Sequence, residues 1–92
     1  MAGSRRKKGV LSEFWCISCG RRGIPIMREH GHKREKGHRK ALYCIHCRAV
    51  INHVETRNEE EARRFAAAFA AGEYAEEAER SRMYAEEHGY FE

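Results

Sequence analysis

Two Cys-x-x-Cys pairs restrict what this chain can fold into more than any other feature of its sequence. Cys16 and Cys19 form the first pair, Cys44 and Cys47 form the second, and 24 residues separate the pairs. A Cys-x-x-Cys turn brings both sulfur atoms to one side of a tight knuckle, so two such turns supply the four ligands of a tetrahedral metal site. We therefore predict that these cysteines bind one Zn²⁺. Because four thiolates leave no position for water, this zinc is expected to be structural.

The sequence around the two pairs is repeated. Residues 14–19 (FWCISC) align with residues 42–47 (LYCIHC) at an offset of 28 residues. Each copy has a large apolar residue, an aromatic residue, Cys, Ile, one variable residue and Cys. This repeat is typical of two equivalent knuckles that approach a single metal ion from opposite sides.

Three other uses of paired cysteines compete with zinc. Two disulfides need an oxidising compartment, which the sequence does not indicate. A redox Cys-x-x-Cys sits at a strand–helix junction of a larger α/β fold, which a chain of 92 residues with this pattern does not build. An iron–sulfur centre uses the same four ligands, and the ligand count alone leaves that alternative open.

The distribution of apolar residues also favours a metal. All ten Leu, Ile and Val residues precede Asn58, and mainly alanine and aromatic residues follow it. Structural zinc in small domains contributes about 10–16 kcal/mol of apparent binding free energy at neutral pH, which exceeds what so thin a core supplies. Removal of the metal is therefore expected to unfold residues 10–57.

Hydrophobic patterning predicts strands around both cysteine pairs. We expect strands at residues 10–16, 41–44 and 49–56, and an edge strand at residues 24–27, where proline is tolerated. In residues 49–56 the even-numbered positions 50, 52 and 54 are expected to face one side of the sheet, and positions 51, 53 and 55 the other. Residues 28–40 are almost wholly polar and contain two glycines, which predicts a solvated loop or a ragged hairpin.

Helices are expected after the last strand. Asn58 followed by Glu61 has the form of an N-terminal capping box, and Phe65 and Phe69 lie on one stripe of the helix that follows. Gly72 is expected to end this helix. A second, mostly polar helix is expected over residues 73–88.

This order of elements resembles a zinc ribbon over residues 10–56. Treble-clef folds also use two Cys-x-x-Cys pairs, but they begin a helix at the second pair, where residues 49–56 predict a strand. The expected fold is a small, metal-stapled α+β protein: an antiparallel zinc ribbon followed by one or two C-terminal helices. The basic loop and Glu-rich tail are also similar to small uncharacterised zinc-ribbon proteins of bacteriophages and prophages, a similarity that assigns no activity.

Charge divides the chain into a basic body and an acidic tail. Residues 1–58 carry 14 Lys or Arg and 4 Glu, a formal charge of +10, whereas residues 59–92 carry 4 Arg and 10 Glu, a formal charge of −6. We expect a flexible basic arm at residues 1–9, the ribbon at residues 10–57 and an Ala- and Glu-rich helical tail at residues 58–92. The tail can shield the body, mimic nucleic acid, pair with a second copy or simply be solvated.

The basic clusters carry the leading functional hypothesis, a non-catalytic module that binds RNA or DNA, or a nucleic-acid-handling complex. The resemblance to zinc ribbons implies such partners by analogy, because ribbons bind nucleic acid or join transcription and translation assemblies. Trp15 and Tyr43 can stack on bases or pack beside the metal site. The candidate phosphate-binding residues are Arg5, Arg6, Lys7, Lys8, Arg21, Arg22, Lys33, Arg34, Lys36, Arg39, Lys40 and Arg48.

A protein-interaction adaptor or inhibitor of a host complex is the alternative function. In that case the helical tail makes the contact through Phe65 and Phe69. An enzyme is not expected. A nuclease with histidines between two knuckles would need an Asp-His or His-His pair and a following helix, and the chain has no Asp.

The histidines have simpler roles in this interpretation. His30, His32 and His38 are expected in a solvated loop, His46 is expected to be a ligand only if a cysteine is displaced, and His53 is expected to be a cross-strand or surface residue. No apolar stretch is long enough for a membrane span, and the N-terminus lacks a signal-peptide core, so a cytoplasmic protein is expected.

Overall fold

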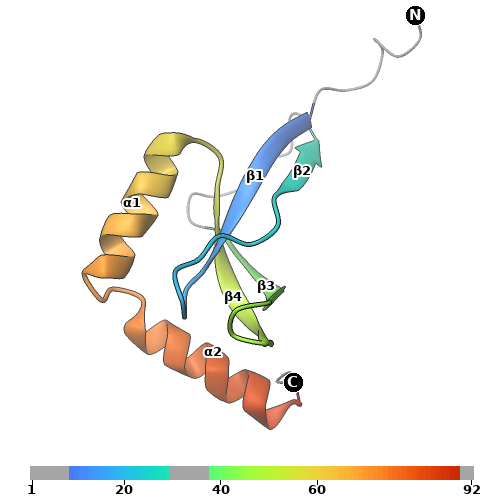
Figure 1. Ribbon diagram of the computed structural model, residues 1–92, viewed down its shortest axis with the longest axis vertical. Coiled ribbons are helices and arrows are strands. Elements are labelled where there is room, and N and C mark those ends of the chain that lie inside the picture. The colour runs from blue at the N-terminus through green and yellow to red at the C-terminus, as the bar shows by residue number, and fades with distance from the viewer. Residues whose placement is uncertain (1–8, 30–37, 90–92) are drawn as a thin grey trace, which may run out of the picture.

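The computed structural model describes residues 9–29 and 38–89 and shows a small α+β protein. Within these residues, a curled antiparallel sheet has the strand order β2-β1-β4-β3, and two helices pack beside it (Figure 1). The elements are β1 (Gly9–Cys16), β2 (Ile26–Glu29), β3 (Arg39–Cys44), β4 (Ala49–Thr56), α1 (Glu59–Ala70) and α2 (Ala75–Glu87). Neither helix in the described ranges has the length and apolar character needed to cross a membrane.

The prediction of a polar loop over residues 28–40 was wrong at both ends. Arg28 and Glu29 belong to β2 and pair with β1, while Arg39 and Lys40 belong to β3 and pair with β4. These residues belong to strands because their backbones pair with β1 and β4. Their polar sequence is compatible with this, since an outer strand of a sheet can carry polar residues. The middle of the predicted loop, residues 30–37, lies outside the described residues.

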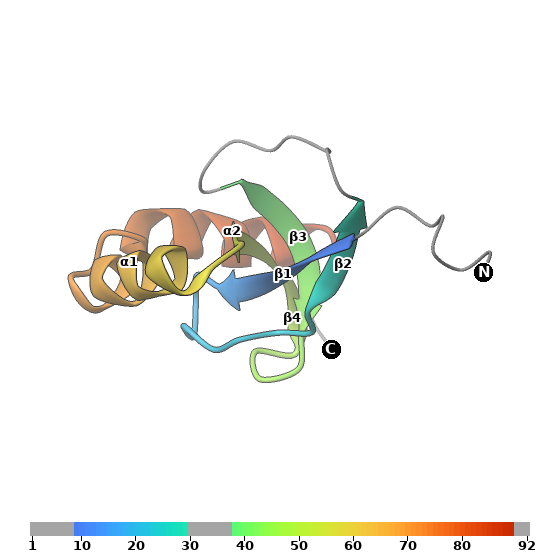
Figure 2. The ribbon, with the colours of Figure 1, turned by 90° about the horizontal axis from the view of Figure 1, so that it is seen from above.

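Strand β4 is the centre of the molecule, and it is more buried than its sequence suggests. Val50, Asn52 and Val54 face the helices, as the alternation predicts, and the backbone N–H of Asn52 donates to Ser81 Oγ of α2 at 2.9 Å. The opposite face is enclosed by the curl of the sheet (Figure 2), so His53 is also fully buried. Of the two roles expected for His53, the cross-strand one is confirmed, since it is in register with Cys16 and Lys40, and the surface one was wrong.

Helix α1 begins at the predicted cap. The Oδ1 atom of Asn58 accepts a hydrogen bond from the backbone N–H of Glu61 at 2.8 Å. The carboxylate of Glu61 reaches back to the N–H of Arg57, also at 2.8 Å, one residue earlier than in a standard capping box. The first bond satisfies a backbone donor that the first turn of a helix leaves without a partner, and the second ties that turn to the residue before the cap, where the tail leaves β4.

The tail packs on the strands through both helices. Phe65 of α1 is buried and stacks on Trp15 of β1, with 5.8 Å between the ring centroids. Ala78 and Ala85 of α2 are also buried, and small side chains of this kind allow a helix to lie close to a sheet. The hydrophobic core is consequently shared between the strands and the tail.

An ion pair joins α2 to the outer strand β3. Arg39 donates from Nε and Nη2 to the two carboxylate oxygens of Glu77, at 2.8 and 3.0 Å. The hydrogen bond from Arg39 is the main reason that the pKa of Glu77 lies below its ordinary value. The Arg39 guanidinium also lies 5.3 Å from the centroid of the Tyr74 ring.

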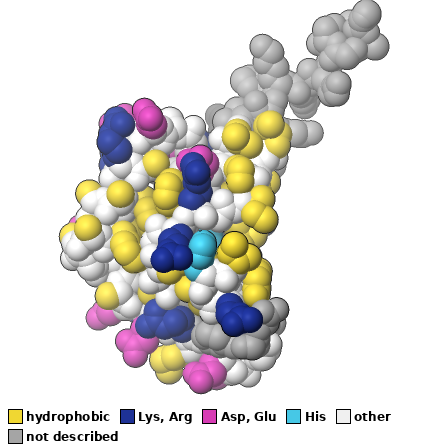
Figure 3. Space-filling model, in the orientation of Figure 1, with side chains coloured by type: hydrophobic (Ala, Val, Ile, Leu, Met, Phe, Trp, Pro, Cys, Tyr) yellow, Lys and Arg dark blue, Asp and Glu magenta, His cyan; other side chains and the backbone are white. Residues whose placement is uncertain are grey.

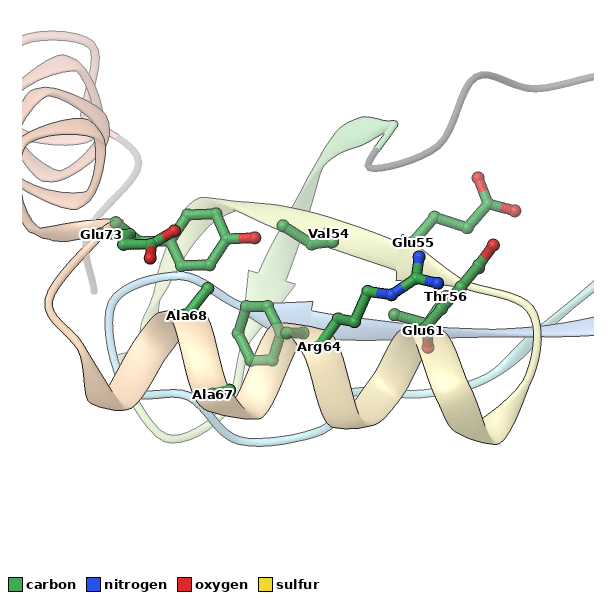
Figure 4. A pocket seen from close by; sticks show the side chains of 10 residues that line it. Val54, Glu55, Thr56, Glu61, Arg64, Ala67, Ala68 and Glu73 are labelled. Atoms are coloured by element: carbon green, nitrogen blue, oxygen red, sulfur yellow. The ribbon is translucent and has the colours of Figure 1, made fainter.

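A cavity of about 480 Å³ lies between α1 and the end of β4. Val54 and Ala68 line its middle, and Glu61 and Arg64 lie at one end (Figure 4). The charged groups already serve the helix, since Glu61 caps its first turn and Arg64 pairs with Glu60 at 2.8 Å. The cavity is thus explained by the way the helix rests on the sheet.

Gly20 offers a test of how closely the tail packs on the strands. Its backbone has φ +76°, and a Cβ atom there would lie 2.6 Å from the Phe69 ring, whereas Gly72 has φ +80° and open space around it. Both Ala substitutions introduce the same backbone strain, but only Gly20→Ala also forces the ring to move. We expect Gly20→Ala to lower the free energy of unfolding by about 1–3 kcal/mol more than Gly72→Ala does. Urea denaturation of the two metal-loaded variants measures the difference, and equal values would contradict the packing of Phe69 against Gly20.

Candidate metal centre

The two cysteine knuckles (residues 16–20 and 44–48) lie at the same end of the sheet. Cys16 is the last residue of β1 and Cys44 is the last residue of β3. Because both strands run antiparallel to β4, the turns that follow them lie at the same end of the sheet. The sequence repeat continues into the backbone. The N–H of Gly20 donates to Cys16 O at 2.8 Å, and the N–H of Arg48 donates to Cys44 O at 2.7 Å.

Gly20 and Arg48 stand at equivalent positions of the repeat, and both have left-handed backbones, with φ of 76° and 59°. Glycine adopts this conformation without strain, whereas arginine does so at a cost of about 1–2 kcal/mol. The second knuckle therefore has the same shape as the first, although its sequence is less suited to it.

The four cysteine sulfurs form a compact cluster suited to a metal ion. All four Sγ atoms lie within 4.8 Å of one another. Cys16 and Cys47 are 3.7 Å apart between sulfurs, and so are Cys19 and Cys44, so each close pair joins the two knuckles. A tetrahedral Zn²⁺ with Zn–S bonds of about 2.3 Å requires sulfurs about 3.8 Å apart, whereas a disulfide requires about 2.05 Å. The spacing matches a four-thiolate metal site, and all four cysteines are free.

Backbone amides point at the sulfurs. The N–H of Ser18 donates to Cys16 Sγ and the N–H of Cys47 donates to Cys44 Sγ, each at 3.4 Å. Such hydrogen bonds stabilise a thiolate and partly offset the electrostatic repulsion among four neighbouring thiolates.

Burial and these hydrogen bonds shift the thiol pKa values in opposite directions. In the metal-free chain, burial raises the pKa of Cys16 and of Cys19 above the ordinary value. Burial also acts to raise the pKa of Cys44, but hydrogen bonds from the backbone of Cys47 and His46 and from the Cys19 side chain outweigh it, so this pKa is lowered. A metal ion that binds here must therefore displace protons that the buried site holds.

The site is continuous with the hydrophobic core. Cys16 and Cys44 are buried, Cys19 and Cys47 are half-buried, and Ile17 beside them packs in the same cluster as Phe65. Because four protein ligands would fill a tetrahedral shell, a metal bound here would hold structure and would have no open position for a reaction.

The described histidines lie outside this cluster of ligands. His46 is exposed, and its Nδ1 atom lies 2.9 Å from Nη1 of Arg21. His53 is buried with its Nδ1 atom 2.7 Å from the carbonyl oxygen of Ile51, and burial lowers its pKa. The carbonyl of His38 accepts from the N–H of Glu55 at 2.9 Å. His30 and His32 lie outside the described residues.

The two aromatic residues before the knuckles have different surroundings. Trp15 packs in the core next to Phe65, and its Nε1–H donates to Thr56 Oγ1 at 2.8 Å. Tyr43 is 45% exposed. The packing role predicted as one alternative for Trp15 is thus the one that the structure shows.

The residues predicted for protein interaction lie inside the molecule. Phe65 is buried, and its ring stacks on the rings of Trp15 and Phe69 with 5.8 Å between centroids in each case. Phe69 is partly buried, and its ring lies against Gly20 of the first knuckle. Both side chains attach the tail to the body.

The predicted basic residues that the structure describes are divided between two places. Arg21, Arg22 and Arg48 are exposed beside the knuckles, whereas Arg39 is engaged with Glu77 and Lys40 lies on the outer strand β3. The remaining members of the predicted set lie outside the described residues: Arg5, Arg6, Lys7, Lys8, Lys33, Arg34 and Lys36.

Arg82 is a basic residue near the site that the sequence did not point to. It belongs to α2 in the acidic tail, yet its Nη1 donates to Ser18 Oγ in the first knuckle at 2.8 Å. The face of the molecule drawn in Figure 3 carries several separate Lys and Arg side chains. Only the packing of α2 on the sheet brings Arg82 to the first knuckle, and no local sequence signal reports that packing.

No protein-family model, no curated protein and no solved structure matches this chain. The resemblance to bacteriophage zinc-ribbon proteins therefore stays a prediction.

Metal loading tests the cysteine cluster directly. We expect the purified chain to bind one Zn²⁺ and to bind Co²⁺ with the absorption bands of a tetrahedral thiolate complex, because the sulfur spacing fits such a shell. Cys44→Ser should lose this spectrum, whereas His46→Ala should keep it, since His46 lies in the same knuckle outside the cluster. Native mass spectrometry gives the stoichiometry, and a metal-free wild-type protein after zinc-supplemented purification would refute the site.

Acid should release the metal. Thiolates are the ligands and the pKa values of Cys16 and Cys19 are raised in the metal-free chain, so protons compete with the metal more strongly as the pH falls. We expect roughly three to four protons to be released per metal ion at neutral pH, and the apparent affinity to rise steeply from about pH 5.5 to pH 7.5. Calorimetric titration in two buffers of different ionisation enthalpy counts these protons. An affinity that does not change with pH would rule out thiolate ligation.

Proposed function

We propose that this chain is a zinc-ribbon protein that binds nucleic acid through arginines gathered around its two knuckles. Zinc is favoured because four cysteines at tetrahedral spacing form the usual structural zinc shell. The ribbon assignment is supported by the two hairpin-like knuckles that meet at one end of an antiparallel sheet.

The observation that carries the proposal is that the arginines at the knuckles have no carboxylate partner in the described part of the chain. Arg21, Arg48 and Arg82 are exposed, and none of them forms an ion pair with a carboxylate of the described residues. By contrast, Arg22 pairs with Glu13 at 2.9 Å, and four others pair with glutamates in the same way: Arg39, Arg57, Arg63 and Arg64. Arg80 of α2 also has no ion pair with a described carboxylate, so three of these four uncompensated arginines lie at or beside the knuckles.

The neighbours of these arginines orient them without neutralising them. Arg21 contacts the ring of His46, and Arg82 donates to the hydroxyl of Ser18. Both arginines keep further N–H donors, and a guanidinium matches the oxygens of a phosphate in a bidentate manner. Several such groups on one face favour a phosphate backbone, where affinity comes largely from the release of counterions.

The adaptor function is less well supported. Its two predicted contact residues, Phe65 and Phe69, pack between the tail and the body. They would have to leave the core before they could contact a partner, and exposing a buried aromatic residue costs about 3 kcal/mol or more.

Charge removal tests the proposal with a matched control. The triple variant Arg21→Gln, Arg48→Gln and Arg82→Gln should weaken binding to a labelled mixed-sequence RNA or DNA at least about tenfold at 100 mM salt. The slope of log affinity against log salt should fall by about 2–3 for loss of three phosphate contacts. Fluorescence anisotropy at several salt concentrations measures both quantities.

The control variant removes the same charge elsewhere. Arg63→Gln, Arg64→Gln and Arg80→Gln change exposed arginines of α1 and α2 that form no hydrogen bond or ion pair with the knuckles, and the first two of them pair with glutamates of α1. Equal weakening in both triple variants would mean that only net charge matters. Absence of any complex at low salt with zinc-loaded wild-type protein would overturn the proposed function, and a loss of zinc in the first variant would assign these arginines to the metal site instead.

A further inference from the structure

The outer edges of the curled sheet enclose an apolar groove. β2 pairs with β1 and β3 pairs with β4, and among the described strands neither outer strand has a second neighbour. Between residues 22–26 and residues 42–46 lies a groove of about 570 Å³, within the usual range for binding sites. Its walls are mainly aliphatic, from Ile24, Pro25 and Ile26 on one side and Leu42 and Ile45 on the other.

The groove leaves large apolar side chains in water. Ile24 is 77% exposed and Ile45 is 69% exposed, while His53 in the lining is almost fully buried. Hydrophobic side chains also gather along the side of the molecule that carries β2 (Figure 3). Contiguous apolar surface of this kind is uncommon on a monomer and marks interaction sites.

The internal repeat indicates what covers such a surface. Ile17 and Ile45 occupy equivalent positions, yet Ile17 is 1% exposed because α2 lies over it through Ala78. In the same way, Trp15 is covered by Phe65 of α1, while the equivalent Tyr43 is 45% exposed. The tail thus covers the aromatic and isoleucine positions of the first copy of the repeat, whereas Tyr43 and Ile45 of the second copy are exposed.

We propose that this groove binds an acidic amphipathic helix of a partner protein. The helix would present an apolar stripe to Ile24 and Ile45, as the chain's own acidic tail does to the first copy of the repeat. A second copy of this chain is a poorer occupant, because its own Phe65 and Ala78 are already buried against its own strands.

Charge supports an acidic partner. Arg22 lines the groove with its side chain 57% exposed, although it also pairs with Glu13 at 2.9 Å. His46 is exposed in the lining, and its ring contacts Arg21, which has no ion pair with a described carboxylate. The body carries a formal charge of +10 over residues 1–58, which would repel a basic helix and steer an acidic one. The two proposals share Arg21, but the apolar walls of the groove are separate from the nucleic-acid proposal, and Arg48 and Arg82 are not part of the groove lining.

A displayed library of helical peptides tests the proposal on the zinc-loaded full chain. The apolar stripe is varied among Ala, Leu, Ile, Met, Phe and Tyr, and the flanking positions are varied among Glu, Gln and Lys. We expect enriched peptides to prefer Glu over Lys at the flanks. Their affinity should fall at least about tenfold in Ile24→Glu with Ile45→Glu, as for central apolar anchors of an interface.

The matched control places the same charges on exposed apolar residues outside the groove. Leu11→Glu with Met83→Glu changes two side chains that are each 52% exposed, and it should leave peptide binding unchanged. Zinc stoichiometry and circular dichroism verify that both double variants fold. For the enriched peptide, amide shifts in the NMR spectrum should concentrate at residues 22–26 and 42–46.

Four results would overturn the proposal. The first is no enrichment over counter-selection, and the second is equal binding by the two double variants. The third is a concentration-dependent dimer that only Ile24→Glu with Ile45→Glu abolishes in sedimentation, which would make a second copy the occupant. The fourth is loss of RNA or DNA binding in that variant, which would make the groove part of a nucleic-acid surface. Failure of the arginine variants to weaken nucleic-acid binding would affect only the proposed function.

Discussion

The close approach of four cysteine sulfurs at one end of the sheet is the constraint on which the rest of the structure depends. β1 and β3 do not pair with each other, and the turns that follow them are joined by the sulfur contacts of Cys16 with Cys47 and Cys19 with Cys44. The exposed contact of Arg21 with His46 also connects these turns. A metal ion between them would tie the two knuckles together and fix the ends of both strands on β4. Without it, four partly buried thiols in a core with few aliphatic residues contribute little to folding.

The tail completes this core, so the acidic segment is more than a solvated extension. Phe65 and Ala78 pack beside the cysteine cluster, and Arg39 binds Glu77 across the strand–helix contact. Part of the charge contrast between body and tail is therefore neutralised within the molecule. The arginines that stay unpaired around the knuckles stand out against this background, and one of them, Arg82, comes from the tail itself.

The repeat explains why the two sides of the molecule differ. Two similar knuckles share one backbone geometry, including the left-handed residues Gly20 and Arg48. The chain has only one tail, however, and it covers only the first copy. In the second copy Tyr43 and Ile45 are exposed, and they line the apolar groove on one side of the sheet.

The sequence by itself determined the features that depend on local spacing. The cysteine spacing and the repeat predicted the four-sulfur cluster, the alternation predicted β4 with the bounds observed, and Asn58 with Glu61 predicted the start of α1. These signals are local because turns, pleats and caps each involve a few neighbouring residues.

Only the tertiary structure decided which residues are buried, paired or exposed. His53 is buried because the sheet curls, Arg39 is held because α2 crosses β3, and Ile17 and Ile45 differ because the tail lies on one knuckle alone. Arg82 lies beside the first knuckle for the same reason. Each outcome depends on contacts between segments far apart in the chain, and residue patterns within one segment carry no information about which other segment will lie against it.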